Sequence, residues 1–383
     1  MSLQTNLLNW FHRNARPLPW RKRYPPYEVW VSEIMLQQTQ METVLPYFGR
    51  WMKKFPTIRA LAKSGEKKVL KAWEGLGYYS RARNLHDSAK AIVKKHNGVF
   101  PHEFDKILSL KGVGRYTAGA IASIAFNEPR PIVDGNVLRV LSRVYAIKKP
   151  IDMESNKELF WKLQKDLIPK GQARYFNQAL MELGALVCTK DDPLCRACPI
   201  RNFCAALKQN KVENYPVRKK KIKITKVNAS ALVLESNGKY LLRKRPVGKI
   251  MGGLWEFPEW KLSKGLKLSQ ETIKNKTLQL AQKEFGMNFN HLEHVGVIQR
   301  NYTHFLEYLQ VFKIFMQGHL TGGCGGAPHH ARRRAARHAE DGMGLPQTGP
   351  VKWPSVWASK REFKKYPFSS AHAKIASLIS QAK

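Results

Sequence analysis

Acidic residues are scarce in this sequence, which has 28 Asp and Glu against 66 Lys and Arg in 383 residues. The formal net charge of +38 is extreme for an enzyme, and the basic residues are spread along the whole chain. We therefore expect a folded surface that binds a polyanion rather than a disordered basic tail. Nucleic acid is the partner that this composition favours, because Lys and Arg neutralise phosphates. An anionic membrane surface is the alternative.

Long hydrophobic runs are missing as well. No apolar stretch approaches the roughly 18 residues that a membrane span requires. Residues 1–20 contain no hydrophobic segment typical of a secretory signal. We expect no membrane partner and a location in the reducing cytoplasm.

Cysteine is rare, with five residues in the chain, yet four of them lie within residues 188–204 at the spacing C-x6-C-x2-C-x5-C. They are Cys188, Cys195, Cys198 and Cys204. Four thiolates on one loop can hold a soft metal centre, either an iron–sulfur cluster or zinc. Structural zinc sites usually pair two short C-x2–4-C knuckles, and this spacing has only one, so it favours the cluster and leaves zinc as the alternative. A disulfide framework fits poorly with five cysteines and no secretory signal.

The length of the chain predicts two domains. Residues 1–211 carry apolar residues at three- and four-residue spacing, which predicts a helical domain. Residues 212–226 are basic and have no helical periodicity, and we interpret them as a linker. Residues 227–383 alternate in the manner of strands and predict an α+β domain on a mainly antiparallel sheet.

Several features of the second domain are specific enough to test. Asn237-Gly238 predicts a hairpin turn. Residues 295–315 predict two strands with a reversal near 303–306, and residues 270–285 and 370–381 predict helices. Residues 318–350 are unusually rich in Gly, Ala, Arg and His, and we expect a disordered basic loop or a segment in a shifted reading frame rather than a site.

Two glycines, Gly112 and Gly114, precede a helical run that begins near Arg115. Without a Cβ atom the backbone can approach a phosphate, and the N–H groups at the start of the helix point at the anion. Such a hairpin would hold DNA without reading its sequence. A plain tight turn is the alternative.

Two carboxylates are candidates for catalysis. Asp134 stands at the mouth of a helix beginning near Gly135, where an N-cap is the alternative role. Glu33 lies among Ile34, Leu36 and other apolar residues of a predicted helix. Burial there would raise the pKa of its carboxyl and let it act as an acid. An exposed Glu paired with a Lys is the alternative.

Together these motifs resemble the adenine DNA glycosylase (MutY) family, over residues 7–317 and again from about residue 366. The resemblance implies an all-helical helix-hairpin-helix glycosylase domain with a [4Fe-4S] loop, followed by a Nudix-like α+β domain. It implies a monomeric, monofunctional enzyme of the bacterial nucleoid, which removes adenine opposite 8-oxoguanine or guanine in double-stranded DNA after flipping the base.

The resemblance also assigns catalytic roles. Glu33 would protonate adenine N7, and Asp134, with Asn136 beside it, would stabilise or capture an oxocarbenium ion. Tyr116 stands where the endonuclease III type has a lysine that forms a Schiff base, so we expect no efficient strand cleavage. Gly112, Gly114 and Arg115 would bind the DNA backbone.

The resemblance places further residues against the substrate, in three groups. These are Trp20, Arg21 and Glu182 around adenine, Gln37, Gln38 and Tyr78 in the opened stack, and Tyr302, Thr303 and His304 against 8-oxoguanine. Structural packing is the alternative for the first group and for Tyr78, and an ordinary hairpin turn is the alternative for the third group.

Residues 248–287 resemble a Nudix hydrolase, but Leu280 and Lys283 replace acids that would hold magnesium and leave Glu284 alone. One carboxylate cannot hold the metal as hydrolysis requires. We therefore expect a lesion-reading domain. The rival functions are an endonuclease III-like oxidised-pyrimidine glycosylase and lyase, a non-catalytic damage-binding protein, and a Nudix pyrophosphatase.

Overall fold

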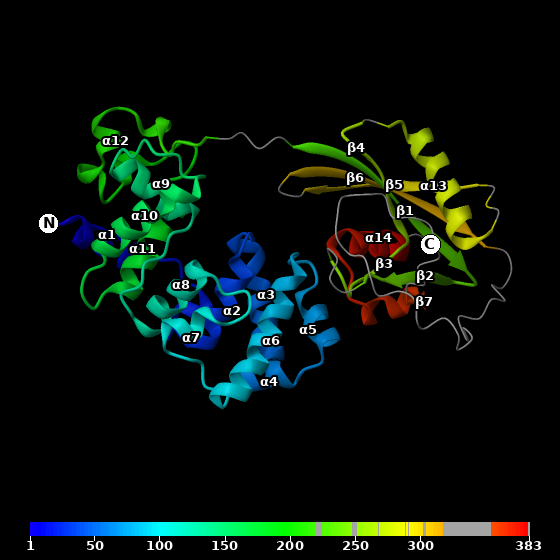
Figure 1. Ribbon diagram of the computed structural model, residues 1–383, viewed down its shortest axis with the longest axis horizontal. Helices are drawn as coiled ribbons and strands as arrows, with labels where there is room; N and C mark the ends of the chain where they lie inside the picture. The colour runs from blue at the N-terminus through cyan, green and yellow to red at the C-terminus, as the bar shows by residue number, and fades with distance from the viewer. Residues whose placement is uncertain are drawn as a thin grey trace, which may run out of the picture. The chain divides into compact units, whose positions relative to one another are not determined.

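The computed structural model describes residues 1–219, 224–246, 251–266, 268–287, 289, 291–301, 304–316 and 354–381. The atypical segment 318–350 and the predicted lesion contacts Tyr302 and Thr303 lie outside the described residues. The chain divides into two compact units, Met1–Ile222 and Lys223–Lys383 (Figure 1). Each unit is described by itself.

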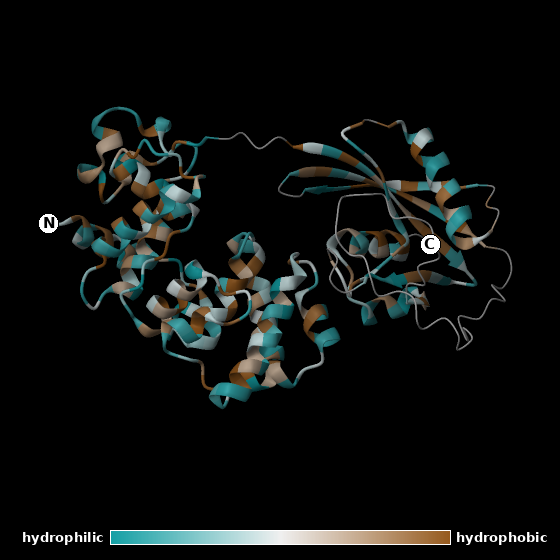
Figure 2. Ribbon diagram, viewed as in Figure 1, coloured by the Kyte–Doolittle hydropathy of each residue, from teal (hydrophilic) through white to brown (hydrophobic). Residues whose placement is uncertain are grey.

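The first unit is helical throughout its described part, residues 1–219, as predicted. Its α-helices are α1 (Leu3–Asn14), α2 (Pro26–Leu36), α3 (Met41–Lys54), α4 (Ile58–Lys63), α5 (Glu66–Trp73), α6 (Tyr79–His96), α7 (Phe104–Leu108), α8 (Arg115–Phe126), α9 (Gly135–Val144), α10 (Glu154–Leu167), α11 (Ala173–Leu186) and α12 (Ala205–Lys208). Its 3-10 helices are η1 (Pro19–Arg21), η2 (Cys195–Ala197), η3 (Arg201–Phe203) and η4 (Val212–Asn214). Figure 2 shows hydrophobic and hydrophilic residues interleaved along these helices, in keeping with the spacing in the sequence. Among the described residues, no helix combines the length and hydrophobicity that crossing a bilayer demands.

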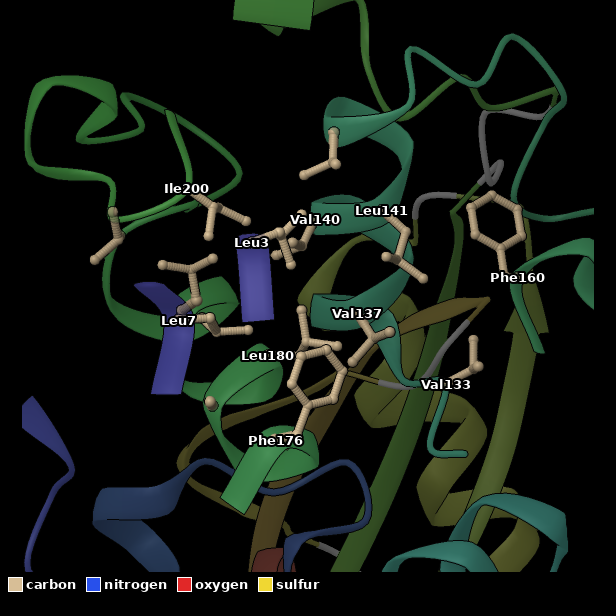
Figure 3. Close-up of a cluster of buried hydrophobic side chains, with 14 of the residues drawn as sticks. Leu3, Leu7, Val133, Val137, Val140, Leu141, Phe160, Phe176, Leu180 and Ile200 are labelled. Carbon is tan, nitrogen blue, oxygen red and sulfur yellow. The ribbon is translucent and has the colours of Figure 1, made fainter. Parts of the chain in front are cut away.

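One core of this unit gathers side chains from α1, α9, α10 and α11 (Figure 3). Helix α9 places Val137, Val140, Leu141 and Val144 on one side at three- and four-residue spacing, and all four are buried. Because α9 begins directly after Asp134, this packing fixes the position of that carboxylate.

Helix α2 lies in a second apolar region and packs on α8. Only Pro26, Glu28 and Leu36 of α2 are not buried, so Glu33 is enclosed by the fold. Helix α8 permits this close packing because it is rich in small residues. A Cβ atom on its Gly119 would stand 2.4 Å from the carbonyl oxygen of Pro131. The segment that leads to Asp134 therefore passes directly over α8.

The predicted linker at 212–226 is shorter in the structure than the sequence suggested. Residues 212–214 form η4 and Tyr215 is buried, with Arg143 Nε donating to the carbonyl oxygens of Val212 and Tyr215 at 3.2 and 3.1 Å. At its other end, β1 already begins at Thr225. The prediction was wrong for residues 212–219, because contacts to a distant arginine and not an apolar periodicity hold this segment to the first unit.

The second unit contains one mixed sheet in its described residues, in the order β3-β2-β1-β6-β5, with β4 paired to β1 and β7 paired to β2. The strands are β1 (Thr225–Ser236), β2 (Lys239–Lys244), β3 (Trp255–Glu256), β4 (Glu259–Lys264), β5 (Glu293–Asn301), β6 (Phe305–Phe315) and β7 (Ser355–Ser359). The helices are α13 (Gln270–Phe285), η5 (Lys360–Lys365) and α14 (Ser370–Gln381). Alternate residues of β1 face opposite sides: Ala231 and Val233 pack with α14, and Leu232 and Leu234 pack with α13. The sheet is therefore covered by a helix on each face (Figure 1).

The predicted helices, hairpin turn and strand pair of this unit are confirmed. Both helices have the expected bounds, and β1 and β2 are joined by a two-residue turn in which Asn237 and Gly238 have φ of 50° and 70°. Strands β5 and β6 form the predicted antiparallel pair. The sheet is mainly antiparallel, and the exception is the parallel pairing of β1 with β6, which alternation within a strand cannot reveal.

Candidate active site

Glu33 is a buried carboxyl in the middle of α2 and is 5% exposed. The Tyr116 hydroxyl, at the start of α8, donates a hydrogen bond to Glu33 Oε2 at 3.1 Å. Burial raises the pKa of Glu33 to about 7; the bond from Tyr116 opposes this rise and the nearby negative charge of Asp134 adds to it. The side chain can thus carry a proton near neutral pH, which is what a general acid requires.

Asp134 is the N-cap of α9, so the capping role that was the alternative for this residue is confirmed. Its Oδ1 accepts from the Val137 backbone N–H at 2.7 Å, and its Oδ2 accepts from Asn136 Nδ2 at 2.9 Å. Burial raises the pKa of Asp134, and the hydrogen bonds from Val137 and Asn136 limit that rise. The positive end of the α9 dipole also favours the anion. Capping and catalysis are compatible, because both need a fixed carboxylate.

The structure brings the four predicted catalytic residues together. Burial and then the charges of Glu33 and Asp134 raise the pKa of Tyr116 well above its ordinary value, so the phenol stays protonated. Asn136 is held in turn by Arg139, whose Nη2 donates to Asn136 Oδ1 at 2.8 Å. Arg139 Nε also donates to the carbonyl oxygen of Cys188 at 2.7 Å, and this residue was not singled out in the sequence.

The predicted adenine contacts have structural partners of their own. Glu182 on α11 is 1% exposed, and its two oxygens accept from Arg16 Nε at 2.7 Å and Arg21 Nη2 at 2.9 Å, among other bonds. Burial would raise the pKa of Glu182, but these two guanidinium groups outweigh it and lower the pKa to about 2. Trp20 is buried against Phe48, with ring centroids 4.8 Å apart. Structural packing thus accounts for the observed contacts of Trp20, Arg21 and Glu182. Arg16 was not identifiable in the sequence, because it is one of 66 basic residues.

Two other predicted DNA-facing turns lie near α2. Gln37 Nε2 donates to Thr117 Oγ1 at 3.1 Å, and Gln38 is exposed with φ of 55°. Tyr78, the N-cap of α6, has φ of 43° and is 51% exposed. An exposed aromatic ring held in the left-handed region is unusual and is consistent with a functional role.

The glycine hairpin joins α7 to α8. Gly112 has φ of 76°, and Gly114 is the N-cap of α8, so the turn leaves N–H groups at the start of that helix. Arg115 lies over the Trp161 ring, with Cζ 4.2 Å from the centroid, and pairs with Glu158. Its predicted phosphate contact stays a prediction.

All four predicted metal ligands line one cavity between the 188–204 loop and α9. The four are unpaired thiols. Burial raises the pKa of Cys198 to about 12 and also raises those of Cys195 and Cys204, so these three thiols would be protonated without a metal. Arg143 Nη1 donates to Cys188 Sγ at 3.3 Å and supplies positive charge. The donor set therefore fits a thiolate-bound metal centre, whose charge makes the thiolates favourable.

In the second unit, buried arginines form ion pairs with the acidic residues that could bind a metal. Glu256, Glu259 and His372 approach one another closely enough to share an ion. However, Arg243 pairs with Glu256 at 3.0 Å and Arg300 pairs with Glu259 at 3.0 Å. The carboxylate charge is already neutralised, so these three residues do not form a free metal site.

The remaining acids and lesion contacts of this unit are placed as follows. Glu284, the acid left in the degenerate Nudix motif, is bound by Arg243 and by Trp260 Nε1, each at 2.8 Å. His304 is exposed, and its carbonyl oxygen accepts from the Thr225 N–H at 2.9 Å. The expectation that this unit lacks a hydrolase metal site stays a prediction.

Comparisons with known proteins match each unit to a protein family. Residues 31–165 match the HhH-GPD superfamily of base excision DNA repair proteins, and residues 229–378 match the NUDIX domain. In the solved structures, the chain resembles a thermostable thymine-DNA glycosylase, with TM-score 0.50 and 27% identity over 54% of this chain and 95% of that one. The helical unit thus has the fold of a DNA glycosylase.

Curated relatives match over more of the chain. The adenine DNA glycosylase of Buchnera aphidicola subsp. Baizongia pistaciae is 41% identical, covering 66% of this chain and 72% of that protein. The Homo sapiens adenine DNA glycosylase is 35% identical, covering 82% and 67%. The Arabidopsis thaliana adenine DNA glycosylase is 42% identical over 67% of this chain, and the match spans 47% of that relative's length. On this evidence the chain belongs to the adenine DNA glycosylase family.

Proposed function

We propose that the protein removes adenine from A:8-oxoguanine and A:G mispairs in double-stranded DNA by hydrolysing the N-glycosidic bond. The observation that carries the proposal is the protonatable Glu33, which is buried beside Asp134 and fixed by Tyr116. The names of the relatives supply adenine as the base. The charge of +38 suits a DNA partner.

In this mechanism the target adenosine leaves the base stack and enters the site. Glu33, in its protonated form, gives its proton to adenine N7, so that the base leaves as a neutral molecule. Tyr116 holds Glu33 in place before the transfer and stabilises the carboxylate after it through the same hydrogen bond. Asp134, oriented by Asn136 and the Val137 N–H, stabilises the positive charge that develops on the sugar or captures it covalently. Water then completes hydrolysis and leaves an abasic site.

The same geometry favours a monofunctional enzyme. Strand cleavage by a glycosylase of the lyase type needs an amine that forms a Schiff base with the sugar. Tyr116 presents a phenol with a raised pKa at that position, and it is already committed to Glu33. The endonuclease III-like lyase is therefore the weaker alternative.

We propose a [4Fe-4S] cluster held by Cys188, Cys195, Cys198 and Cys204 in the first unit. When bound, such a group would fix the loop 188–204 and so the exposed Arg196 and Arg201 that can meet phosphate. Zinc is the alternative, and metal analysis separates the two. We also propose that the protein acts as a monomer in the cytoplasm. We further propose that the second unit reads 8-oxoguanine through residues around His304 and does not hydrolyse nucleotides.

The test is single-turnover adenine release by the full chain from matched A:8-oxoG and A:G duplexes. A duplex with an oxidised pyrimidine, and borohydride trapping of any Schiff base, report on the lyase alternative. We expect faster release from A:8-oxoG, a reduced preference in His304→Ala, and no trapping at the rate of base release. Equal release by wild type and Glu33→Gln would contradict the assigned chemistry, and binding without release would favour the non-catalytic alternative.

A further inference from the structure

Arg81, in the first turn of α6, is a buried cation. It is 7% exposed, and among the described residues no carboxylate lies within ion-pair distance of it. A positive charge near the N-terminus of a helix also opposes the helix dipole. Burial lowers the pKa of Arg81 to about 10, which shows how costly this position is for its charge. Such a group persists only where its hydrogen bonds compensate.

Those hydrogen bonds run to two separate segments. Nη1 donates to the carbonyl oxygens of Ile34 and Met35 at 3.0 and 2.9 Å, and also to that of Gln37. Nη2 donates to the Leu76 carbonyl oxygen at 2.9 Å and to Thr39 Oγ1 at 3.1 Å, with Gly77 at 3.4 Å. The first set satisfies carbonyl groups at the C-terminus of α2, which no helical N–H can reach. One guanidinium thus joins the helix that carries Glu33 to the turn before α6.

The backbone on each side of this guanidinium is strained. Gln38 and Tyr78 have φ of 55° and 43°, a region that residues with a Cβ atom rarely adopt. Such conformations persist where surrounding contacts over-determine them. The Arg81 Cζ atom also lies 5.5 Å from the centroid of the Tyr78 ring. The two strained residues are both among those predicted to face DNA.

We propose that Arg81 is a positioning residue, which fixes the Gln37–Thr39 turn and the Gly77–Tyr78 turn relative to Glu33 so that both are ready to hold the DNA open. This inference rests on the proposed function. The role requires a planar guanidinium, because its two Nη groups donate to the two segments at once, whereas an ammonium has a single nitrogen on a flexible stem. A role in stability alone would not require a planar guanidinium.

The experiment compares Arg81→Lys and Arg81→Ala with wild type in the full chain. Arg174→Lys is the matched control, since Arg174 caps the carbonyl oxygens of Ile124 and Ala125 at 2.6 and 2.8 Å and touches neither turn. Single-turnover adenine release is measured on the A:8-oxoG duplex. Base unstacking is measured with 2-aminopurine opposite 8-oxoguanine, in a Glu33→Gln background that prevents excision. Thermal melting reports on folding.

We expect Arg81→Lys to lower the release rate by about 100-fold, the scale of a 1 Å misplacement, and to reduce the 2-aminopurine signal. Arg174→Lys should lower the melting temperature without changing that signal. Millimolar guanidinium should restore part of the rate to Arg81→Ala, and sodium chloride at equal ionic strength should not.

Unchanged release and unstacking in a folded Arg81→Lys variant would overturn the inference. If the Arg81 variants do not fold, Thr39→Val replaces them, because it removes one bond of the set at a partly exposed position, and wild-type behaviour of that variant would overturn the inference equally. No adenine release by wild type would refute the proposed function, and this inference with it. Release by wild type with full activity of Arg81→Lys would refute the inference alone.

Discussion

Glu33→Gln should abolish adenine release and yet stabilise the protein at alkaline pH. The pKa of Glu33 is raised from 4.5 to about 7 on folding, so the folded state holds this proton more tightly than the unfolded chain does. Stability is therefore lost as pH rises from the unfolded pKa to the folded pKa, and the loss is complete above pH 7. At 1.36 kcal/mol per pKa unit, the ionised carboxyl costs about 3 kcal/mol of folding free energy. About 2 kcal/mol of this cost develops between pH 5.5 and 8.5.

Glutamine has the size of glutamate and no charge, and its side-chain oxygen can still accept from Tyr116. The assay is urea denaturation of both proteins at pH 5.5 and 8.5, followed through the transition of the helical unit. The difference in free energy of unfolding between variant and wild type should grow by about 2 kcal/mol over this interval, so that any pH-independent effect of the substitution cancels. A difference that does not change with pH would show that the pKa of Glu33 is not raised by burial, and would remove the basis for its role as an acid.

Three further substitutions test other parts of the site, and a fourth, at an exposed ion pair, serves as a comparison. Asp134→Asn keeps an N-cap of similar quality but removes the charge, so adenine release should fall by about 100-fold or more with little change in melting temperature; a rate near wild type would show that Asp134 acts only as a cap. Cys198→Ser should lower the iron content and the thermal stability of the helical unit, measured by metal analysis and melting, and zinc in the wild type would replace the cluster assignment. Glu182→Gln strips the carboxylate from two partly buried guanidinium groups and should destabilise by about 3 to 5 kcal/mol. Glu158→Gln, whose pair with Arg115 is exposed, should cost at most about 1 kcal/mol, and equal losses in the two variants would contradict the burial argument.

The features that were predictable from the sequence are those set by local patterns. The spacing of apolar residues located α13 and α14, and Asn237-Gly238 located the turn between β1 and β2. The crowding of the cysteines located the cavity that they line. The apolar neighbours of Glu33 indicated its burial, because they belong to the same helix.

Contacts between residues far apart in the chain were not predictable. Arg16 and Glu182 are separated by 166 positions, and nothing local marks one arginine among 66 basic residues as a buried partner. For the same reason Arg81 and Arg139 gave no signal, although each joins segments of the site. The parallel pairing of β1 with β6 also depends on how distant strands meet.

The role of Glu33 as the acid is tested most directly by the pH dependence of single-turnover adenine release from an A:8-oxoG duplex. The rate should be high at acidic pH and fall as pH rises through about 7, the pKa of the Glu33 carboxyl that supplies the proton, and Glu33→Gln should show no such activity. A wild-type rate that is independent of pH between 5.5 and 8.5, or that survives in Glu33→Gln, would contradict this role.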